Sequence, residues 1–217
     1  MKEWRLPLMI AAVLLVIVGG GYWLMHRLQR TPLPAGAREW TADGSIMAPT
    51  IKPGDVFVTR KVSEDDLRRG MVVAFLDDRN RMNVLRIAGL PGDRLELRRG
   101  IVLIDGQPTV QHGSGSIKDE NGRDLYPLTE RFPGEVGAHR MYEATFSTAP
   151  EMRVSSRRVY LLADNRLTGW DSRGSMLGYP SAVKISRIIG RVETIMSSRD
   201  PSRAGQPLDL PASAMDQ

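Results

Sequence analysis

Short apolar runs separated by turn residues follow one another along the chain from about residue 55 to residue 195. Residues 55–61 (DVFVTRK) alternate between polar and apolar side chains, which is typical of a half-buried strand. Further strands are expected at residues 71–76, 81–90, 159–163 and 188–195. Residues 95–98 and 101–104 flank Arg99-Gly100 and predict a hairpin. The pattern therefore predicts a mainly β domain.

Three stretches depart from this pattern. Residues 63–69 (SEDDLRR) begin with a serine cap followed by acidic residues and predict a helix of about two turns. Between residues 109 and 156 the strand pattern weakens and glycine, serine and charged residues increase, which indicates an insertion or small subdomain. Residues 197–217 contain three prolines and no apolar face, so a flexible tail is expected.

The N-terminal region contains a second kind of pattern. Residues 6–25 carry no charged side chain, and a helix of that length spans a bilayer core. A cleaved signal peptide usually has an apolar core of only about 7–15 residues. We therefore expect an uncleaved transmembrane anchor at residues 6–25, preceded by a short arm at 1–5 and followed by a linker at 26–39 and a β domain at 40–196. Basic residues flank the span on both sides, so charge alone does not set its orientation.

Composition narrows the function classes. The chain has 217 residues, 41% hydrophobic and 25% charged, as in ordinary globular proteins. It has no cysteine, which excludes disulfides, cysteine-bound zinc and a thiol nucleophile. The net charge of +5 suits proximity to anionic lipid. The basic residues are scattered and no nucleic-acid motif occurs, so no nucleic-acid partner is expected. No cofactor or metal is predicted.

Four segments, taken in order, resemble motifs of the bacterial type I signal peptidases. They are residues 45–51 (SIMAPTI) with 53–55 (PGD), 69–75 (RGMVVAF), 85–93 (LRIAGLPGD), and 163–166 (ADNR) with 171–173 (DSR). Each segment alone is weakly specific, but together they cover roughly residues 40–195, and a single N-terminal span agrees with them. The resemblance implies a signal-peptidase-like β-barrel or sandwich domain with a small inserted subdomain.

The resemblance also implies a serine endopeptidase in which a lysine is the general base. Such a lysine must be neutral to accept the serine proton, which requires burial in an apolar site. The serine stands before the methionine of the first segment, and the lysine stands before the arginine of the third. This chain has Ile46 and Leu85 at those positions. Neither side chain can attack a carbonyl or accept a proton, so no catalytic residue is assigned.

The remaining motif residues are expected to form the cleft and its scaffold: Ser45, Met47, Pro49, Arg86, Asp164, Asn165, Asp171, Ser172 and Arg173. Two positions depart from the family pattern, since Ala163 replaces a glycine and Gly169 replaces a serine. Met47 could belong to a membrane-facing rim or fill a gap in the core. Arg86 is expected to form an ion pair with Asp171 that links the third and fourth segments.

Relocated catalysis is the competing interpretation of the motif residues. Ser45 is the nearest hydroxyl, but in an extended segment it faces away from the side of Ile46. His112 and His139 lie in the weakly patterned stretch and have no spacing that suggests a serine–histidine pair.

The sequence thus favours a membrane-anchored, signal-peptidase-like protein that does not cleave by the serine–lysine mechanism and that binds or assists exported proteins through extended peptides. An active signal peptidase with relocated groups and a structural partner of a secretion machine remain the alternatives. The resemblance implies a single-pass protein of the cytoplasmic (inner) membrane, with the β domain expected on the outer, periplasmic side.

Overall fold

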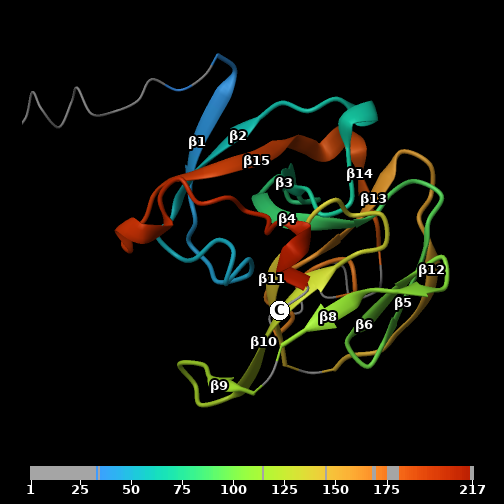
Figure 1. Cartoon of the computed structure of the whole chain (residues 1–217). Coiled ribbons are helices and arrows are strands. Elements are labelled where there is room, and N and C mark those ends of the chain that lie inside the picture. The colour runs from blue at the N-terminus through green and yellow to red at the C-terminus, as the bar shows by residue number, and fades with distance from the viewer. Residues whose placement is uncertain are drawn as a thin grey trace, which may run out of the picture. The chain divides into compact units, whose positions relative to one another are not determined.

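A seven-stranded antiparallel sheet forms the larger part of the β domain (Figure 1). The structure is a computed structural model that describes residues 33, 35–113, 115–144, 146–167, 170–174 and 181–215. The sheet order is β1-β2-β15-β3-β4-β13-β14. These strands are β1 (Ala37–Thr41), β2 (Val56–Arg60), β15 (Ile188–Ser197), β3 (Val72–Leu76), β4 (Met82–Gly89), β13 (Arg158–Leu162) and β14 (Val183–Lys184).

Two four-stranded sheets complete the described part of the domain. One has the order β12-β5-β6-β7 and consists of β12 (Ala149–Arg153), β5 (Arg94–Arg98), β6 (Ile101–Ile104) and β7 (Gln107–Pro108). The other has the order β11-β10-β8, with β9 also paired to β10, and consists of β11 (His139–Glu143), β10 (Asp124–Arg131), β8 (Val110–His112) and β9 (Ile117–Lys118). All four strands of this last sheet lie in the stretch in which an insertion or small subdomain is expected.

The strands expected from the hydrophobic pattern are confirmed, with ends that shift by one or two residues. The hairpin at Arg99-Gly100 is confirmed as well, between β5 and β6. Both turn residues have positive φ, +48° at Arg99 and +83° at Gly100. Such a turn matches the right-handed twist of the flanking strands, because both central residues of a type I′ turn need positive φ.

Two local expectations differ from the structure. The helix expected at residues 63–69 is only the 3-10 turn η1 (Glu64–Asp66), because Ser63 makes no capping bond to a backbone N–H and the chain becomes extended at Leu67. Strand β1 begins at Ala37, inside the expected linker, because residues 37–41 pair with β2.

The C-terminal stretch expected to be a flexible tail packs on the domain instead. It contains the 3-10 turns η3 (Pro201–Arg203) and η4 (Ala212–Met215), whereas η2 (Ile185–Arg187) precedes β15. Figure 1 shows this stretch in red, running from the end of β15 back toward β10 and β11. Leu210 and Ala138 exchange two backbone hydrogen bonds, and Met215 is buried. The C-terminal stretch is therefore held on the domain by long-range contacts, which a local sequence pattern does not predict.

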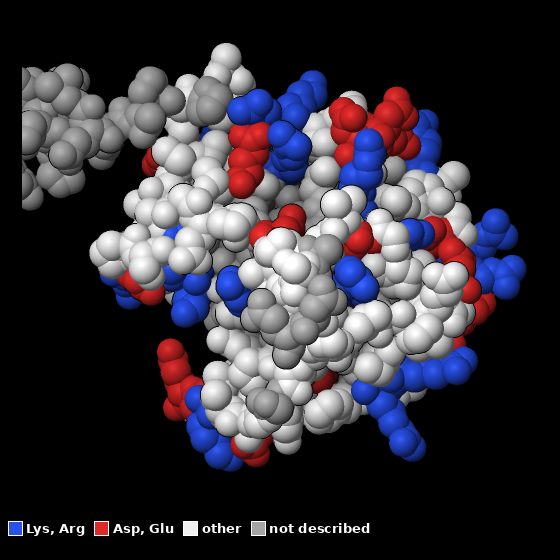
Figure 2. Space-filling view, viewed as in Figure 1, with Lys and Arg blue, Asp and Glu red and all other residues white. Residues whose placement is uncertain are grey.

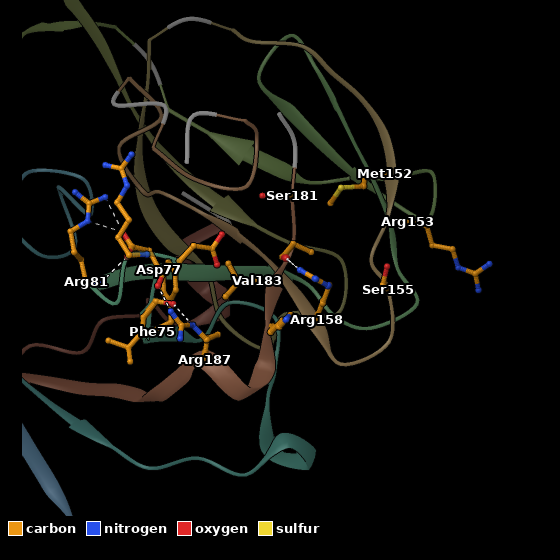
Figure 3. Close-up of a pocket in the computed structure, with 15 residues that line it drawn as sticks. Phe75, Asp77, Arg81, Met152, Arg153, Ser155, Arg158, Ser181, Val183 and Arg187 are labelled. Carbon is orange, nitrogen blue, oxygen red and sulfur yellow. Dashed lines mark hydrogen bonds and ion pairs between the residues drawn. The ribbon is translucent and has the colours of Figure 1, made fainter. Parts of the chain in front are cut away.

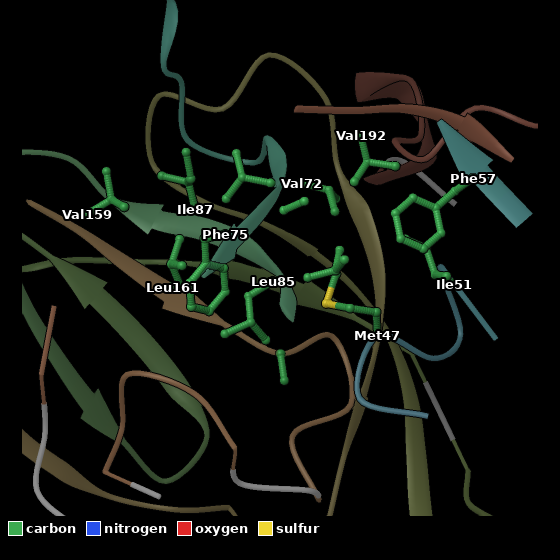
Figure 4. Packing of buried hydrophobic residues seen from close by; sticks show 14 of the residues in the cluster. Met47, Ile51, Phe57, Val72, Phe75, Leu85, Ile87, Val159, Leu161 and Val192 are labelled. Atoms are coloured by element: carbon green, nitrogen blue, oxygen red, sulfur yellow. The ribbon is translucent and has the colours of Figure 1, made fainter. Parts of the chain in front are cut away.

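The main core lies against the seven-stranded sheet and combines residues of the first, second, third and fourth segments. Figure 4 shows Met47, Val72, Phe75, Leu85 and Leu161 packed within it. Gly190 allows β15 to approach β2, since an added Cβ would lie 2.4 Å from the carbonyl oxygen of Arg60. A second cluster, which includes Leu95, Val102 and Phe132, lies under the sheet of β5 and β6.

The transmembrane anchor expected at residues 6–25 lies outside the described residues. Among the residues that the structure does describe, no helix is long and apolar enough to cross a membrane. On the face seen in Figure 2, lysine and arginine side chains are interspersed with aspartate and glutamate.

Candidate functional site

Leu85 and Ile46 belong to one apolar cluster. Leu85 lies in β4 opposite Val73 of β3, and only 1% of its surface is exposed. Ile46 lies in the turn that follows β1 and is partly buried against the same cluster. Its backbone carbonyl accepts a hydrogen bond of 3.0 Å from the backbone N–H of Asn165. The first and fourth segments are therefore joined beside the place where the first and third segments pack together.

The nearest hydroxyl to Ile46 in the sequence is not positioned beside a base. Ser45 is exposed, and its carbonyl accepts a hydrogen bond of 3.2 Å from Asn165 Nδ2. No hydrogen bond of the Ser45 hydroxyl occurs within the described residues. The four lysines of the described region, Lys52, Lys61, Lys118 and Lys184, are all exposed. None of them therefore has the apolar burial that a general-base lysine requires.

Met47 and Pro49 complete the first segment. Met47 is 2% exposed and packs inside the main core, as the core alternative for this residue requires. Pro49 follows a cis peptide bond and is partly buried. The next residue, Thr50, is buried, and its hydroxyl donates a hydrogen bond of 2.5 Å to Asp164 Oδ2. The turn of the first segment is thereby fixed to the fourth.

Arg86 is the centre of a buried charge cluster. Its Nε lies 2.9 Å from Asp164 Oδ1, and its Nη2 lies 2.8 Å from Asp164 Oδ2. Its Nη1 donates to the carbonyl of Gly70 at 2.6 Å and to Asp209 Oδ1 at 2.5 Å. The pairing of Arg86 with Asp171 that the sequence suggests is therefore wrong. The third and fourth segments are linked as expected, but through Asp164.

Burial and charge act in opposite directions on this pair. Burial favours the neutral forms, but attraction between the two charges outweighs it, so the pKa of Arg86 is raised and that of Asp164 is lowered. Both groups are therefore ionised at neutral pH. A buried ion pair of this kind fixes the position of Asp164 relative to β4, because no water reaches either charge to replace its partner.

Asp171, Ser172 and Arg173 support the backbone of β13 and the loop after it. Asp171 Oδ2 accepts a hydrogen bond from the N–H of Ala163 at 3.1 Å, and Asp171 Oδ1 lies 2.8 Å from Arg173 Nε. The Ser172 hydroxyl accepts from the N–H of Leu161 at 3.0 Å. These three side chains are thus used for scaffolding. Gly169, where a serine is expected from the resemblance, lies outside the described residues.

A second buried cluster, which no sequence pattern indicates, is formed by Glu130, His139 and Arg166. Glu130 of β10 stands opposite His139 of β11, and their side chains approach at 3.2 Å. Glu130 also forms an ion pair with Arg166, and the second ring nitrogen of His139 lies 3.1 Å from Glu135. Arg166 belongs to the fourth segment, but no sequence signal marks Glu130 as its partner, since the two are joined only by the pairing of distant strands.

His139 is a scaffold residue, and it carries a charge. Each ring nitrogen faces a carboxylate, and a carboxylate accepts but does not donate, so both nitrogens must carry hydrogen. Burial and the charge of Arg86 lower the pKa of His139, but the bonds to Glu130 and Glu135 outweigh them and the pKa is raised. Burial alone raises the pKa of Glu130, whereas Arg166 and His139 lower it to about 2. His112, in contrast, is exposed on β8.

Residues 35–197 match the family model described as "Signal peptidase, peptidase S26". The chain belongs to this family. It is 31% identical over 156 residues to "Signal peptidase I" of Bacillus caldolyticus, covering 71% of this chain and 76% of the relative. It is 27% identical over 176 residues to "Signal peptidase I" of Bacillus amyloliquefaciens, covering 80% of this chain and 78% of the relative. It is 26% identical over 193 residues to "Signal peptidase IB" of Staphylococcus aureus (strain COL), covering 88% and 86%.

The mainly β architecture with its curled sheet agrees with a serine-type signal peptidase I fold. All four sequence segments lie inside the matched range. The signal peptidase match ends at residue 197, so the packed C-terminal stretch that supplies Asp209 lies beyond it.

Proposed function

We propose that this protein is a membrane-anchored member of the signal peptidase family that does not cleave by the serine–lysine mechanism and that binds or assists exported proteins. Membership of the family supports a role in protein export, because the relatives are named signal peptidases. The proposed location is the inner membrane, with one N-terminal span and the β domain on the outer, periplasmic side. No catalytic residue is proposed.

The burial of Leu85 is the observation that carries this proposal. A general base needs a basic nitrogen next to the enzyme's own serine, but position 85 holds a leucine that is 1% exposed and packs in an apolar cluster, and Ile46 packs against the same cluster. Full burial of Leu85 contributes about 1.5–3 kcal/mol to folding, and the partly buried Ile46 contributes less, whereas a neutral buried amine is costly to maintain. Replacement of both members of a reactive pair by branched apolar side chains is consistent with loss of the reaction and retention of the fold.

Binding of extended peptides would use free sheet edges. Strand β1 is an edge of the seven-stranded sheet and leads directly into the turn that holds Ile46. An edge strand offers unpaired N–H and C=O groups to an added strand. The affinity would therefore come from the backbone of the peptide, with no need for a reactive dyad.

A cleavage and binding assay tests the proposal. The full chain, purified in detergent, is mixed with a fluorescent precursor that carries a small-x-small cleavage site, and both anisotropy and product formation are followed. Ser45→Ala is compared with Ser156→Ala, a control at another exposed serine. We expect binding without turnover. Sustained turnover that Ser45→Ala abolishes and Ser156→Ala leaves unchanged would establish the active alternative.

The packed state of Leu85 also favours a second candidate, a structural partner of a secretion machine. The apolar cluster around Leu85 is already packed, so it does not require a bound peptide to cover it. The same assay separates the two, because a structural partner neither binds the precursor nor cleaves it. Saturable binding that competes with unlabelled signal peptide, but not with a peptide whose apolar core carries charges, supports the peptide-binding function.

A further inference from the structure

A cavity of about 920 Å³ lies between the turn after β3, the end of β12 and strand β14 (Figure 3). Its apolar part includes Phe75, Met152 and Val183. Neither Ile46 nor Leu85 lines it. A volume of this size falls in the range of small-molecule sites, about 300–1,000 Å³. The cavity is therefore a candidate ligand site separate from the position of the family's reaction.

The lining of the cavity has a strong excess of positive charge. Two of its side chains are acidic, Asp77 and Asp78. Six are basic: Arg79, Arg81, Arg153, Arg158, Lys184 and Arg187. The excess is four positive units in a recess with low-dielectric walls, which focuses the electrostatic field and attracts anions.

One of the two carboxylates is already engaged. Asp77 accepts hydrogen bonds from Arg81 Nε at 2.9 Å and from the backbone N–H groups of Arg79 and Arg81. Arg81 in turn lies over the ring of Trp170 at 5.2 Å. This pair is neutral as a unit. Five cations of the lining therefore face a single further carboxylate, that of Asp78.

Two of those cations are held in place by neutral groups. Arg187 donates to the carbonyls of Leu76 and Asp77 and to the Asn80 side chain. Arg158 Nη1 donates to the carbonyl of Ala182 at 2.5 Å. These bonds orient the guanidinium groups without neutralising their charge. Each is thereby preorganised for an anion, which reduces the entropy lost on binding.

The other three cations have no such anchor. Within the described residues, the side chains of Arg79, Arg153 and Lys184 make no hydrogen bond or ion pair. Arg79, Arg153 and Lys184 are exposed, so they can close over a ligand that the anchored arginines hold.

We propose that this cavity binds a phosphate-bearing ligand, with Arg158 and Arg187 as the fixed contacts and Arg79, Arg153 and Lys184 as mobile ones. A guanidinium presents a planar fork of N–H donors that matches the oxygens of a phosphate. A phosphate monoester or diphosphate concentrates two or more negative charges in a small volume, which suits an excess of four positive units better than a single carboxylate does. A phospholipid headgroup and a soluble phosphate ester share this chemistry.

Calorimetric titration of the full chain in zwitterionic detergent with inorganic pyrophosphate tests the site. Arg158→Gln/Arg187→Gln removes the fixed contacts. Arg79→Gln/Arg153→Gln removes two contacts whose side chains have no partner to lose, so its folding is not at risk. Arg38→Gln/Arg140→Gln, at two exposed arginines outside the cavity, gives the same change in net charge. We expect each cavity variant to bind pyrophosphate about tenfold or more weakly, with the control close to the parent chain.

Further arms distinguish the source of the phosphate and the competing ligand class. Phosphatidic acid added to the micelles competes with pyrophosphate if a lipid headgroup is the ligand, and phosphatidylglycerol at equal surface charge competes less. If the ligand is a soluble phosphate ester, neither phosphatidic acid nor phosphatidylglycerol lowers the affinity for pyrophosphate. Equal affinity of the parent, control and cavity variants would overturn the proposal, as would the absence of pyrophosphate binding. Tighter binding of a glutamate-rich peptide than of pyrophosphate would overturn it in favour of an acidic peptide.

Discussion

The guanidinium of Arg86 and the carboxylate of Asp164 meet through two parallel contacts of 2.9 Å and 2.8 Å, and both side chains are at most 1% exposed. Arg86 directly follows Leu85 in β4, and Asp164 lies just beyond β13. The strand that places Leu85 in the apolar core thus places Arg86 in a charge cluster on its other face. The fold of this segment depends on both faces.

Removal of one partner of this pair should be strongly destabilising. We expect Arg86→Ala or Asp164→Ala to lower the free energy of unfolding by about 3–5 kcal/mol, because each leaves a buried charge without its partner. The measurement is urea unfolding followed by circular dichroism. Arg98→Ala breaks an exposed pair with Glu96 and serves as the control, with a much smaller expected loss because water screens an exposed ion pair. Equal losses at the two sites would contradict the role given to burial.

Rebuilding the dyad tests the assignment of Ile46 and Leu85. The double variant Ile46→Ser/Leu85→Lys should regain weak cleavage of a precursor after small residues, whereas each single variant should be inert, because each lacks half of the reaction. Leu85→Lys alone should also destabilise the domain, since it buries an amine in an apolar cluster. Product formation is measured by mass spectrometry at matched protein concentrations. Cleavage by the parent chain at the rate of the double variant would contradict the assignment.

Stability should pass through a maximum in the weakly acidic range. Glu130 has its pKa lowered from 4.5 to about 2, so its contribution, roughly 3 kcal/mol, is present above pH 4.5 and is lost as the pH falls through the folded value. The pKa values of Asp164 and Asp55 are lowered too, so the stability that these carboxylates contribute is also lost as the pH falls. His139 has a raised pKa in the folded state. Its contribution to the free energy of unfolding is therefore complete below the unfolded-state pKa of 6.5 and is lost as the pH rises through the folded-state pKa.

Two variants separate the acid and alkaline limbs of this profile. The free energy of unfolding is measured in urea between pH 3 and pH 9 at constant ionic strength. Glu130→Gln should flatten the acid limb, and His139→Gln should flatten the alkaline limb. His112→Gln, at an exposed histidine without an ion pair among the described residues, is the matched control for histidine removal. An alkaline limb that persists in His139→Gln would show that another group causes it.

The packed C-terminal stretch should stabilise the domain although it lies beyond the family match. Asp209 forms a second ion pair with Arg86, and Arg203 pairs with Asp55 at 2.7 Å and donates to the carbonyl of Thr50 at 2.9 Å. We expect Asp209→Asn to lower the melting midpoint by a few degrees, corresponding to about 1 kcal/mol for a half-exposed carboxylate. Asp43→Asn, at an exposed position without an ion pair among the described residues, is the control. Equal changes in the melting midpoint for Asp209→Asn and Asp43→Asn would show that Asp209 does not stabilise the domain through the charge cluster.

Local alternation and turn chemistry were sufficient to predict seven of the fifteen strands in the described part of the domain. A strand needs only side chains that suit its two faces, so β2, β3 and β4 could be located from residues 55–90, and the Arg99-Gly100 turn from its two positions. The four segments and the family were recognisable for the same reason, since they are contiguous. The identities of Ile46 and Leu85 could likewise be read directly, whereas their placement at the dyad positions is what the motif resemblance implies.

The partners of buried charges were decided only by the tertiary structure. Arg86 could pair with Asp164, Asp171 or Asp209 as far as the sequence is concerned, and strand register and side-chain direction select Asp164 and Asp209. The Glu130–His139 contact depends on the register of β10 against β11, and a shift of one residue would turn either side chain to the opposite face. The sequence by itself therefore determined the strands with clear alternation or apolar runs and the apolar character of Ile46 and Leu85. Long-range packing determined which charges meet, because a buried charge is stable only where another part of the chain supplies its partner.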